Sequence, residues 1–142
     1  MKDGNNTNEK ETEYLSSQER NKLLWRLRSD FAWAGTKIPE SVEIDNEEYM
    51  LRDMIEELGE IDLLSLDEIA EIRALIPKLQ EKAKVNEELL ETEELTVSEA
   101  EAIYEEAGGI LRAAMDLKDR LEGKIGEKGA SEFKRMLNTQ KL

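Results

Sequence analysis

The sequence has no cysteine and no histidine. The first absence excludes disulfides, thiol nucleophiles and thiolate metal sites, and the second removes the commonest general base and metal ligand of proteins. Only two prolines occur, and aromatic residues make up 5% of the chain. No apolar run approaches the ~20 residues that cross a bilayer, and the polar N-terminus does not resemble a signal peptide. These absences predict a cytoplasmic protein that does not bind membranes.

Charge is abundant but unevenly spread. Charged residues make up 38% of the 142 residues, and the formal net charge is −14. Residues 38–106 carry 23 acidic and 5 basic groups, a net charge of −18, whereas residues 1–37 carry +1 and residues 107–142 carry +3. An acidic middle repels nucleic acid and favours a basic protein partner. The alternative is that the charge only keeps a helical surface soluble.

Heptad spacing over residues 65–123 predicts a long antiparallel helical hairpin, the feature around which the chain is organised. Its seam recurs at steps of three and four in two runs: Ile69, Ile72, Ile76, Leu79, Ala83, Asn86 and Leu90, then Ala100, Ile103, Ala107, Ile110, Ala114, Leu117 and Leu121. Asn86 is the polar member of this seam. It either fixes the register of the pair or reaches solvent near the hairpin tip, and we favour the tip.

Two weak points lie near one level of this hairpin. Pro77 removes one backbone hydrogen bond, and Gly108-Gly109 lowers the helix propensity of the return helix. Together they predict a shared kink. Tight packing at the small residues is the favoured cause, and a hinge or a groove for a partner is the alternative.

Three capping boxes predict where helices begin: Ser16 with Glu19, Ser65 with Glu68, and Thr96 with Glu99. The first helix is expected to run to Ala34 before Gly35, and the last hairpin helix to end at Gly123. Between them, the alternation of residues 41–51 predicts a β-hairpin about an Asp45-Asn46 turn, which places Val42 opposite Tyr49 and Ile44 opposite Glu47. A short helix over residues 52–58 should follow and end at Gly59.

The expected fold is therefore mainly α, with residues 1–15 as a disordered tail and residues 16–142 as a single domain. Within it, residues 16–64 hold the first helix, the β-hairpin and the short helix. Residues 65–123 form the helical hairpin, and residues 124–142 form a loop and a short C-terminal helix, at about residues 131–137.

Glu56-Glu57-x-x-Glu60 is the strongest enzyme-like pattern. It resembles half of the metal site of the all-helical nucleotide pyrophosphohydrolases, in which helical carboxylates bind Mg²⁺. Those enzymes need a second helix with Glu-x-x-Asp, which this chain lacks. No phosphate-binding loop, catalytic triad or dinucleotide fingerprint occurs either. We therefore expect no metal, no cofactor and no enzymatic activity.

Both tryptophans lie in the predicted first helix but outside its apolar stripe, which comprises Leu23, Leu24, Leu27, Phe31 and Ala34. Trp33 shares a sector with Lys22 and Arg26, and Trp25 lies nearby. Either the helix is sandwiched so that both faces are buried, or Lys22, Trp25, Arg26 and Trp33 form a partner-binding surface. The size of the indoles favours burial.

The sequence thus favours a non-enzymatic adaptor or scaffold that binds a protein partner. A basic partner would suit the acidic charge of the chain. A homodimer is an option, because a hairpin with only one helix packed on it would leave apolar residues that flank the seam exposed: Leu75, Leu89, Tyr104, Leu111 and Met115. The alternative is an RNA- or ribosome-associated factor, with basic residues of the first helix and the C-terminal segment meeting at the hairpin base. The acidic middle weighs against that alternative.

The stretch IPESVEIDNEEYMLRDMIEEL, between a capped Trp-containing helix and a long acidic hairpin, resembles a small family of uncharacterised archaeal proteins. The resemblance covers about residues 16–122. It implies an archaeal cytoplasmic protein of unknown function and transfers no site residues.

Overall fold

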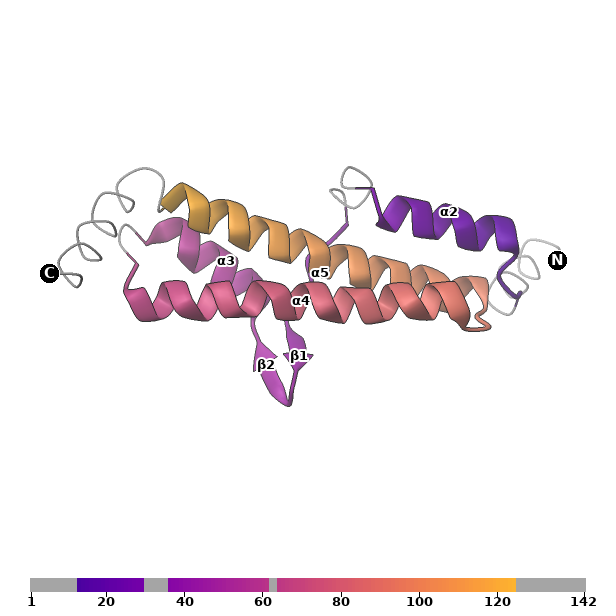
Figure 1. Ribbon diagram of the computed structural model, residues 1–142, viewed down its shortest axis with the longest axis horizontal. Coiled ribbons are helices and arrows are strands. Elements are labelled where there is room, and N and C mark those ends of the chain that lie inside the picture. The colour runs from indigo at the N-terminus through magenta and orange to yellow at the C-terminus, as the bar shows by residue number, and fades with distance from the viewer. Residues whose placement is uncertain (1–12, 30–35, 62–63, 125–142) are drawn as a thin grey trace, which may run out of the picture. The chain divides into compact units, whose positions relative to one another are not determined.

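The computed structural model describes residues 13–29, 36–61 and 64–124 and confirms a mainly α-helical chain. The described elements are α2 (Ser17–Leu27), β1 (Val42–Ile44), β2 (Glu47–Tyr49), α3 (Leu51–Glu60), α4 (Leu66–Thr92) and α5 (Val97–Lys124) (Figure 1). The predicted C-terminal helix at about 131–137 lies outside the described residues. The chain divides into two compact units, Met1–Pro39 with Gln80–Arg112 and Glu40–Leu79 with Ala113–Leu142. They are called the first and second units below, and the prediction of a single domain over residues 16–142 stays a prediction.

The first unit packs α2 against the C-terminal half of α4 and the N-terminal half of α5. Leu23, Leu24 and Leu27 are the buried side chains of α2, and they share one helical face. The two long helices contribute Ala83, Asn86, Leu90, Ala100, Tyr104, Ala107 and Ile110 to the same core. This unit is therefore a small three-helix arrangement.

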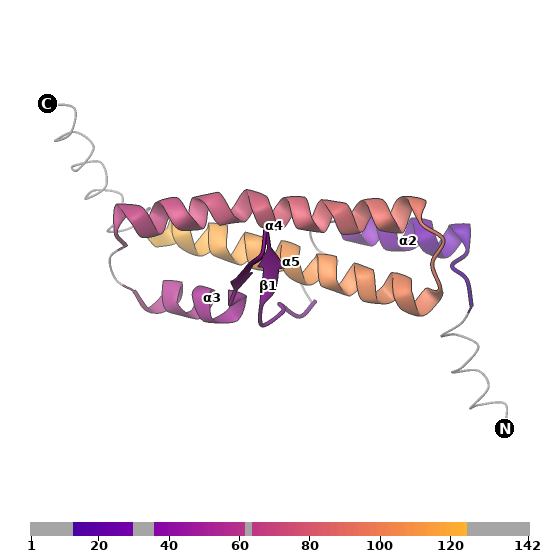
Figure 2. The same ribbon diagram turned by 90° about the horizontal axis from the view of Figure 1, so that it is seen from below.

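The second unit combines the β-hairpin, α3 and the other halves of α4 and α5. The strands pair with the predicted register, Val42 opposite Tyr49 and Ile44 opposite Glu47. Asp45 and Asn46 have φ values of 53° and 66°, the left-handed pair that a type I′ turn requires. The hairpin projects away from the helices (Figures 1 and 2). Leu51, Ile55 and Leu58 of α3 are buried with Ile69, Ile72, Leu75, Leu79, Ala113, Ala114, Leu117 and Leu121 of the long helices.

All three predicted capping boxes are present. The backbone N–H of Glu19 donates to Ser16 Oγ over 3.1 Å, and the corresponding distances are 3.1 Å from Glu68 to Ser65 and 3.1 Å from Glu99 to Thr96. In each box the glutamate returns the bond to the backbone N–H of the cap residue. Reciprocal bonds of this kind satisfy amide groups that a helix start leaves unpaired, which explains why the three starts could be read from sequence.

Both long helices bury more than the predicted seam. Leu75 and Tyr104 were expected on exposed flanks, but they are only 2% and 4% exposed. The reason is that α3 and α2 add a third helix to each half of the pair, so a wider stripe faces the core. Leu111 and Met115 are partly buried and Leu89 is exposed, so the argument for self-association rests on Leu89 alone.

Contrary to our expectation, Asn86 does not reach solvent. It is buried, and its Nδ2 donates to the carbonyl oxygen of Ile103 over 3.4 Å. The amide crosses from α4 to α5 because its position faces the partner helix, where a buried polar group needs a hydrogen-bond partner. Asn86 is therefore a polar contact within the seam that links the two helices of the first unit.

Three predicted helix ends were wrong. Helix α2 ends at Leu27 rather than Ala34, and its last turn tightens as the N–H of Ser29 donates to Arg26 O over 3.2 Å. Helices α3 and α5 continue through Gly59 and Gly123 to Glu60 and Lys124. A glycine ends a helix when it takes a positive φ, and none of the described glycines does so.

The last residues of the predicted tail are ordered. Leu15 N–H donates to Leu95 O and Val97 N–H donates to Glu13 O, each over 2.8 Å, so Tyr14 pairs with Thr96 in an antiparallel bridge. The predicted boundary at residue 15 is thus too late by at least three residues. The bridge ties the start of the described chain to the loop between α4 and α5.

Gly109 lies where the backbone of Lys37 to Pro39 approaches α5. A Cβ at Gly109 would approach Lys37 O and would lie 3.0 Å from Pro39 Cδ. Nearby, Arg112 donates to the carbonyl oxygen of Thr36 over 2.7 Å. A loop therefore packs closely at Gly109, where we had predicted tight packing between helices, and the shared kink stays a prediction. Helix α4 continues through Pro77.

We expect Gly109→Ala and Gly123→Ala to change stability in opposite directions. Both replace a glycine of α5, and alanine gains up to about 1 kcal/mol of helix propensity. A Cβ at Gly123 meets nothing within 4 Å, so this gain should appear as a higher melting temperature. At Gly109 the overlap with Lys37 should outweigh it, with a net loss of about 1–3 kcal/mol in urea unfolding. Equal effects of the two substitutions would contradict this packing.

The pKa of Glu99 is lowered, first because its carboxylate accepts the backbone N–H of Thr96. A carboxyl group with a depressed folded-state pKa stabilises the fold above its unfolded pKa and loses that effect as the pH falls through the folded value. We therefore expect the α5 cap to weaken only below the ordinary glutamate range. Carbon-13 NMR titration should give a midpoint for Glu99 below the ordinary glutamate value, and a midpoint at or above that value would contradict the assignment.

Candidate interaction surface on α2

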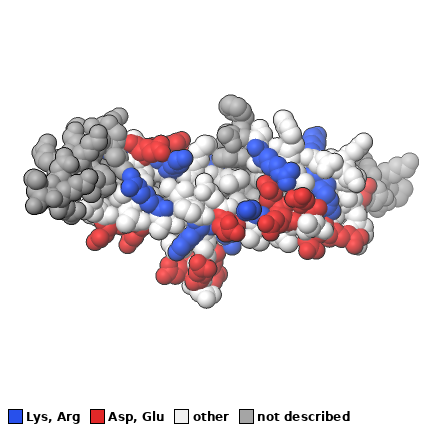
Figure 3. All heavy atoms as spheres, in the orientation of Figure 1, with Lys and Arg blue, Asp and Glu red and all other residues white. Residues whose placement is uncertain are grey.

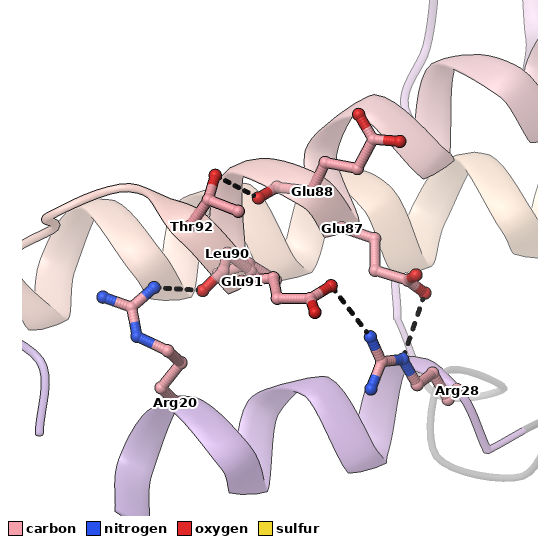
Figure 4. A network of polar contacts seen from close by, with 7 residues as sticks. All are labelled: Arg20, Arg28, Glu87, Glu88, Leu90, Glu91 and Thr92. Carbon is pink, nitrogen blue, oxygen red and sulfur yellow. Dashed lines mark hydrogen bonds and ion pairs between the residues drawn. The ribbon is translucent and has the colours of Figure 1, made fainter. Parts of the chain in front are cut away.

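Arg20 fastens α2 to the end of α4. Its guanidinium donates to the carbonyl oxygens of Leu90 and Glu93, the second over 2.7 Å (Figure 4). These carbonyls belong to the last turn of α4 and the residue beyond its end, where backbone acceptors lack helical partners and the helix dipole is negative. A cation from another helix therefore caps α4.

Arg28 fastens the other end of α2 to the same helix. Its Nε lies 3.5 Å from a carboxylate oxygen of Glu87, and an Nη lies 3.3 Å from one of Glu91 (Figure 4). Glu87 and Glu91 are one turn apart on α4, so one guanidinium reaches both. With Arg20 near residues 90–93 and Arg28 near residues 87–91, α2 runs antiparallel to α4.

Arg26 points to α5 instead. Its guanidinium carbon lies 5.0 Å from the centroid of the Tyr104 ring, a cation–π distance. The Tyr104 hydroxyl is buried and has no hydrogen-bond partner among the described residues. Arg26 and Arg28 thus lie on the two flanks of α2, one toward each long helix, with the buried leucines between them.

Trp25 lies on the remaining side of α2, and it is 69% exposed. Lys22, one turn earlier, is also exposed. The favoured interpretation, burial of both indoles, was therefore wrong for Trp25, because α2 packs on the long helices through one face only. Trp33 lies outside the described residues. Of the four predicted site residues, Lys22 and Trp25 face solvent together, and Arg26 is exposed but turned toward Tyr104.

The basic residues of the first helix do not form an open cationic patch. Arg20 and Arg28 bond to α4, and Arg26 covers an aromatic ring. The bonds of Arg20 place α2 beside the loop between α4 and α5, at the tip of the hairpin and not at its base as we predicted. The described basic residues of the C-terminal cluster belong to the second unit: Lys118, Arg120 and Lys124. The other members of that cluster, Lys128, Lys134 and Arg135, lie outside the described residues, and the predicted joint basic surface stays a prediction.

Acidic side chains dominate other parts of the surface. They gather on the β-hairpin and over the C-terminal half of α4 (Figure 3), where the exposed ones include Glu43, Asp45, Glu47, Glu48, Glu88 and Glu91. Within the described residues, no three acidic side chains are grouped closely enough to hold a metal ion. None of the described helices is long and apolar enough to cross a membrane.

Sequence reasoning missed the structural roles of Arg20 and Arg28. For Arg20 a signal was present, because it precedes Leu23, Leu24 and Leu27 by three, four and seven residues and so shares their helical face. A cation on a core-facing stripe needs a nearby acceptor. For Arg28 no comparable signal exists, because its partners are about 60 residues away in the sequence.

A comparison with protein families gives one match. A model of the family of unknown function DUF5788 matches residues 15–139, which include all the described helices and strands. The chain therefore belongs to this family. No curated protein and no solved structure matches it.

We expect Arg20→Ala to destabilise the protein more than Arg28→Ala. Hydrogen bonds from a charged group contribute about 1.5–3 kcal/mol, whereas exposed ion pairs contribute about 0.2–1 kcal/mol and weaken with salt. Urea unfolding at low and high salt measures both changes. Arg20→Lys should recover only part of the loss, because an ammonium lacks the fork that reaches two carbonyls. A larger loss in Arg28→Ala would contradict the capping role of Arg20.

The exposure of Trp25 can be tested alone in the Trp33→Phe variant. Its emission should be red-shifted and readily quenched by acrylamide, because most of the indole contacts water. Blue-shifted emission that resists acrylamide would contradict the orientation of α2. Adding RNA at low salt should leave the spectrum unchanged, because few cations near Trp25 are free to pair with phosphates.

Proposed function

We propose that this protein is a non-enzymatic adaptor that binds a protein partner through the outer face of α2, centred on Trp25. The exposure of Trp25 is the observation that carries the proposal. Tryptophan is among the residues most enriched at interface hot spots, and an indole in water forgoes the large apolar burial that it could gain.

The way α2 is held supports the same function. Arg20 and Arg28 bond to α4, Arg26 lies over Tyr104, and three leucines are buried beneath the helix. A helix fixed on two flanks presents its outer face in one orientation. A pre-organised surface loses less conformational entropy when it binds.

Exposed apolar side chains also concentrate in this unit. Among the described residues, the first unit contains Tyr14, Trp25, Val85 and Leu89, and the second contains Met50. Glutamates are frequent around them, including Glu88, Glu91, Glu93 and Glu94. The preferred partner therefore combines an apolar contact for Trp25 with basic residues near it.

An RNA- or ribosome-associated role is the weaker alternative. It needs cations that can pair with phosphates, and three of the four arginines and lysines of α2 and its cap already contact other parts of the first unit. Lys22 alone among them has no partner within the described residues.

We extend the proposal to the archaeal origin and the cytoplasmic location that the sequence implies.

Site-specific photo-crosslinking tests this function. Benzoylphenylalanine placed at Trp25, in cells that naturally make the protein, should give an adduct with a protein. The same group at Glu101, an exposed position on α5 of the same unit, is the control and should not give that adduct. An adduct with RNA at position 25 would favour the alternative. Identical products at both positions, or none at position 25, would overturn the proposed surface.

A further inference from the structure

A hollow of about 200 Å³ lies in the second unit between α3 and the first turns of α4. Its apolar lining includes Met54, Leu58 and Ile72, and Ile61 and Leu64 contribute from the connection between the helices. The described side chains therefore leave an apolar concave surface beside two helices. Its size suits one side chain of a partner more than a drug-sized ligand.

Three glutamates complete the lining, and no lysine or arginine does. Glu68 is engaged in its capping box, where a carboxylate oxygen accepts the N–H of Ser65 over 3.2 Å. Glu57 and Glu71 are exposed and have no ion pair within the described residues. Two unpaired carboxylates thus stand at an apolar hollow.

Two basic side chains of α5 lie on the other flank of α3. Lys124 Nζ donates to Gly59 O over 3.4 Å, and the guanidinium of Arg120 also lies against Gly59. At about 100° per residue, Gly59 is roughly 160° around the helix from Glu57. Basic groups of α5 therefore neutralise one flank of α3 and leave the flank at the hollow acidic.

The pKa of Tyr49, in the β-hairpin of the same unit, is raised, chiefly because its hydroxyl donates to Glu47 over 2.7 Å. Burial and the charges of Glu47, Asp45 and Glu71 act in the same direction.

We propose that this hollow binds a lysine or arginine side chain from a basic segment of a partner protein. Such a side chain has an apolar stem, which would cover Met54 and Ile61, and a charged head, which would pair with Glu57 and Glu71. A small metal ion would leave the apolar surface uncovered, and an aliphatic side chain would leave the carboxylates without a counter-charge. This inference names the chemistry of the partner and so rests on the proposed protein-binding function, but it uses a contact separate from Trp25.

Two synthetic peptides of equal charge test the proposal on the full-length protein. One alternates lysine with serine, and the other replaces each lysine by diaminobutyric acid, which at pH 6 keeps the charge but has a shorter stem. In amide NMR spectra of the labelled protein, the lysine peptide should shift signals of residues 54–58 and 68–72 and bind several-fold more tightly. Equal affinity of the two peptides would overturn the proposal, because attraction to the net charge alone predicts that result.

Matched variants locate the contact. Glu57→Gln with Glu71→Gln removes two charges at the hollow, and Glu101→Gln with Glu105→Gln removes two exposed charges from α5 in the first unit. The first pair should weaken the lysine peptide about fivefold to tenfold, and the second about twofold or less. Equal losses would overturn the proposal.

Two further results separate this site from its alternatives. If spermidine alone shifts the same signals and the peptide does not, the ligand is a free amine, and a partner side chain is excluded. Crosslinking at Trp25 does not involve the hollow, so the two proposals can fail separately. Peptide binding without a crosslinked adduct would contradict the proposed α2 surface. An adduct without peptide binding would contradict the proposed lysine or arginine site at the hollow.

Discussion

Two helices that pack along one seam can bury only one stripe of each other, and the rest of this structure depends on that constraint. Each half of the α4–α5 pair meets it by adding a short helix, α2 in the first unit and α3 in the second. The added helices bury Tyr104 and Leu75, which a bare hairpin would expose to water. The same arrangement decides which residues remain for binding. The outer faces of α2 and α3 and the spaces beside them are among the surfaces that stay open.

Polar contacts hold α2 and leave α3 with an asymmetric surface. Arg20 and Arg28 act on α4, and their use there removes most of the charge that a nucleic acid would need. At α3, the basic side chains of α5 reach one flank and not the other. Because Arg20 and Arg28 contact α4, few free cations surround the exposed indole of Trp25. Because Arg120 and Lys124 lie at Gly59, the hollow on the other flank of α3 stays acidic. In a chain with net charge −14, the positions of the cations thus shape the local surface charge as much as the number of carboxylates does.

Sequence reasoning succeeded where structure is local. The capping boxes at Ser16, Ser65 and Thr96 and the Asp45-Asn46 turn each depend on a few adjacent residues, so their chemistry could be read directly. Sequence reasoning failed where a residue's neighbours in the fold are distant from it in the sequence. Asn86 is buried because α5 lies opposite it, and Trp25 is exposed because α2 packs through one face. Glycines 59 and 123 were misread as helix ends, since glycine permits a positive φ without requiring one. The candidate site was thus half predicted: Lys22 and Trp25 face solvent, whereas Arg26 turned out to contact Tyr104.

The contacts that hold α2 also set an order of events during synthesis. Arg20 and Arg28 bond to residues 59 to 73 positions later, and the Leu23 face completes a core with residues that reach Ile110. During synthesis, the surface on which α2 packs is incomplete until the first half of α5 is made. The three leucines of α2 are therefore not fully covered before that point. The second unit joins residues 40–79 to a segment made later still, so both short helices wait for α5.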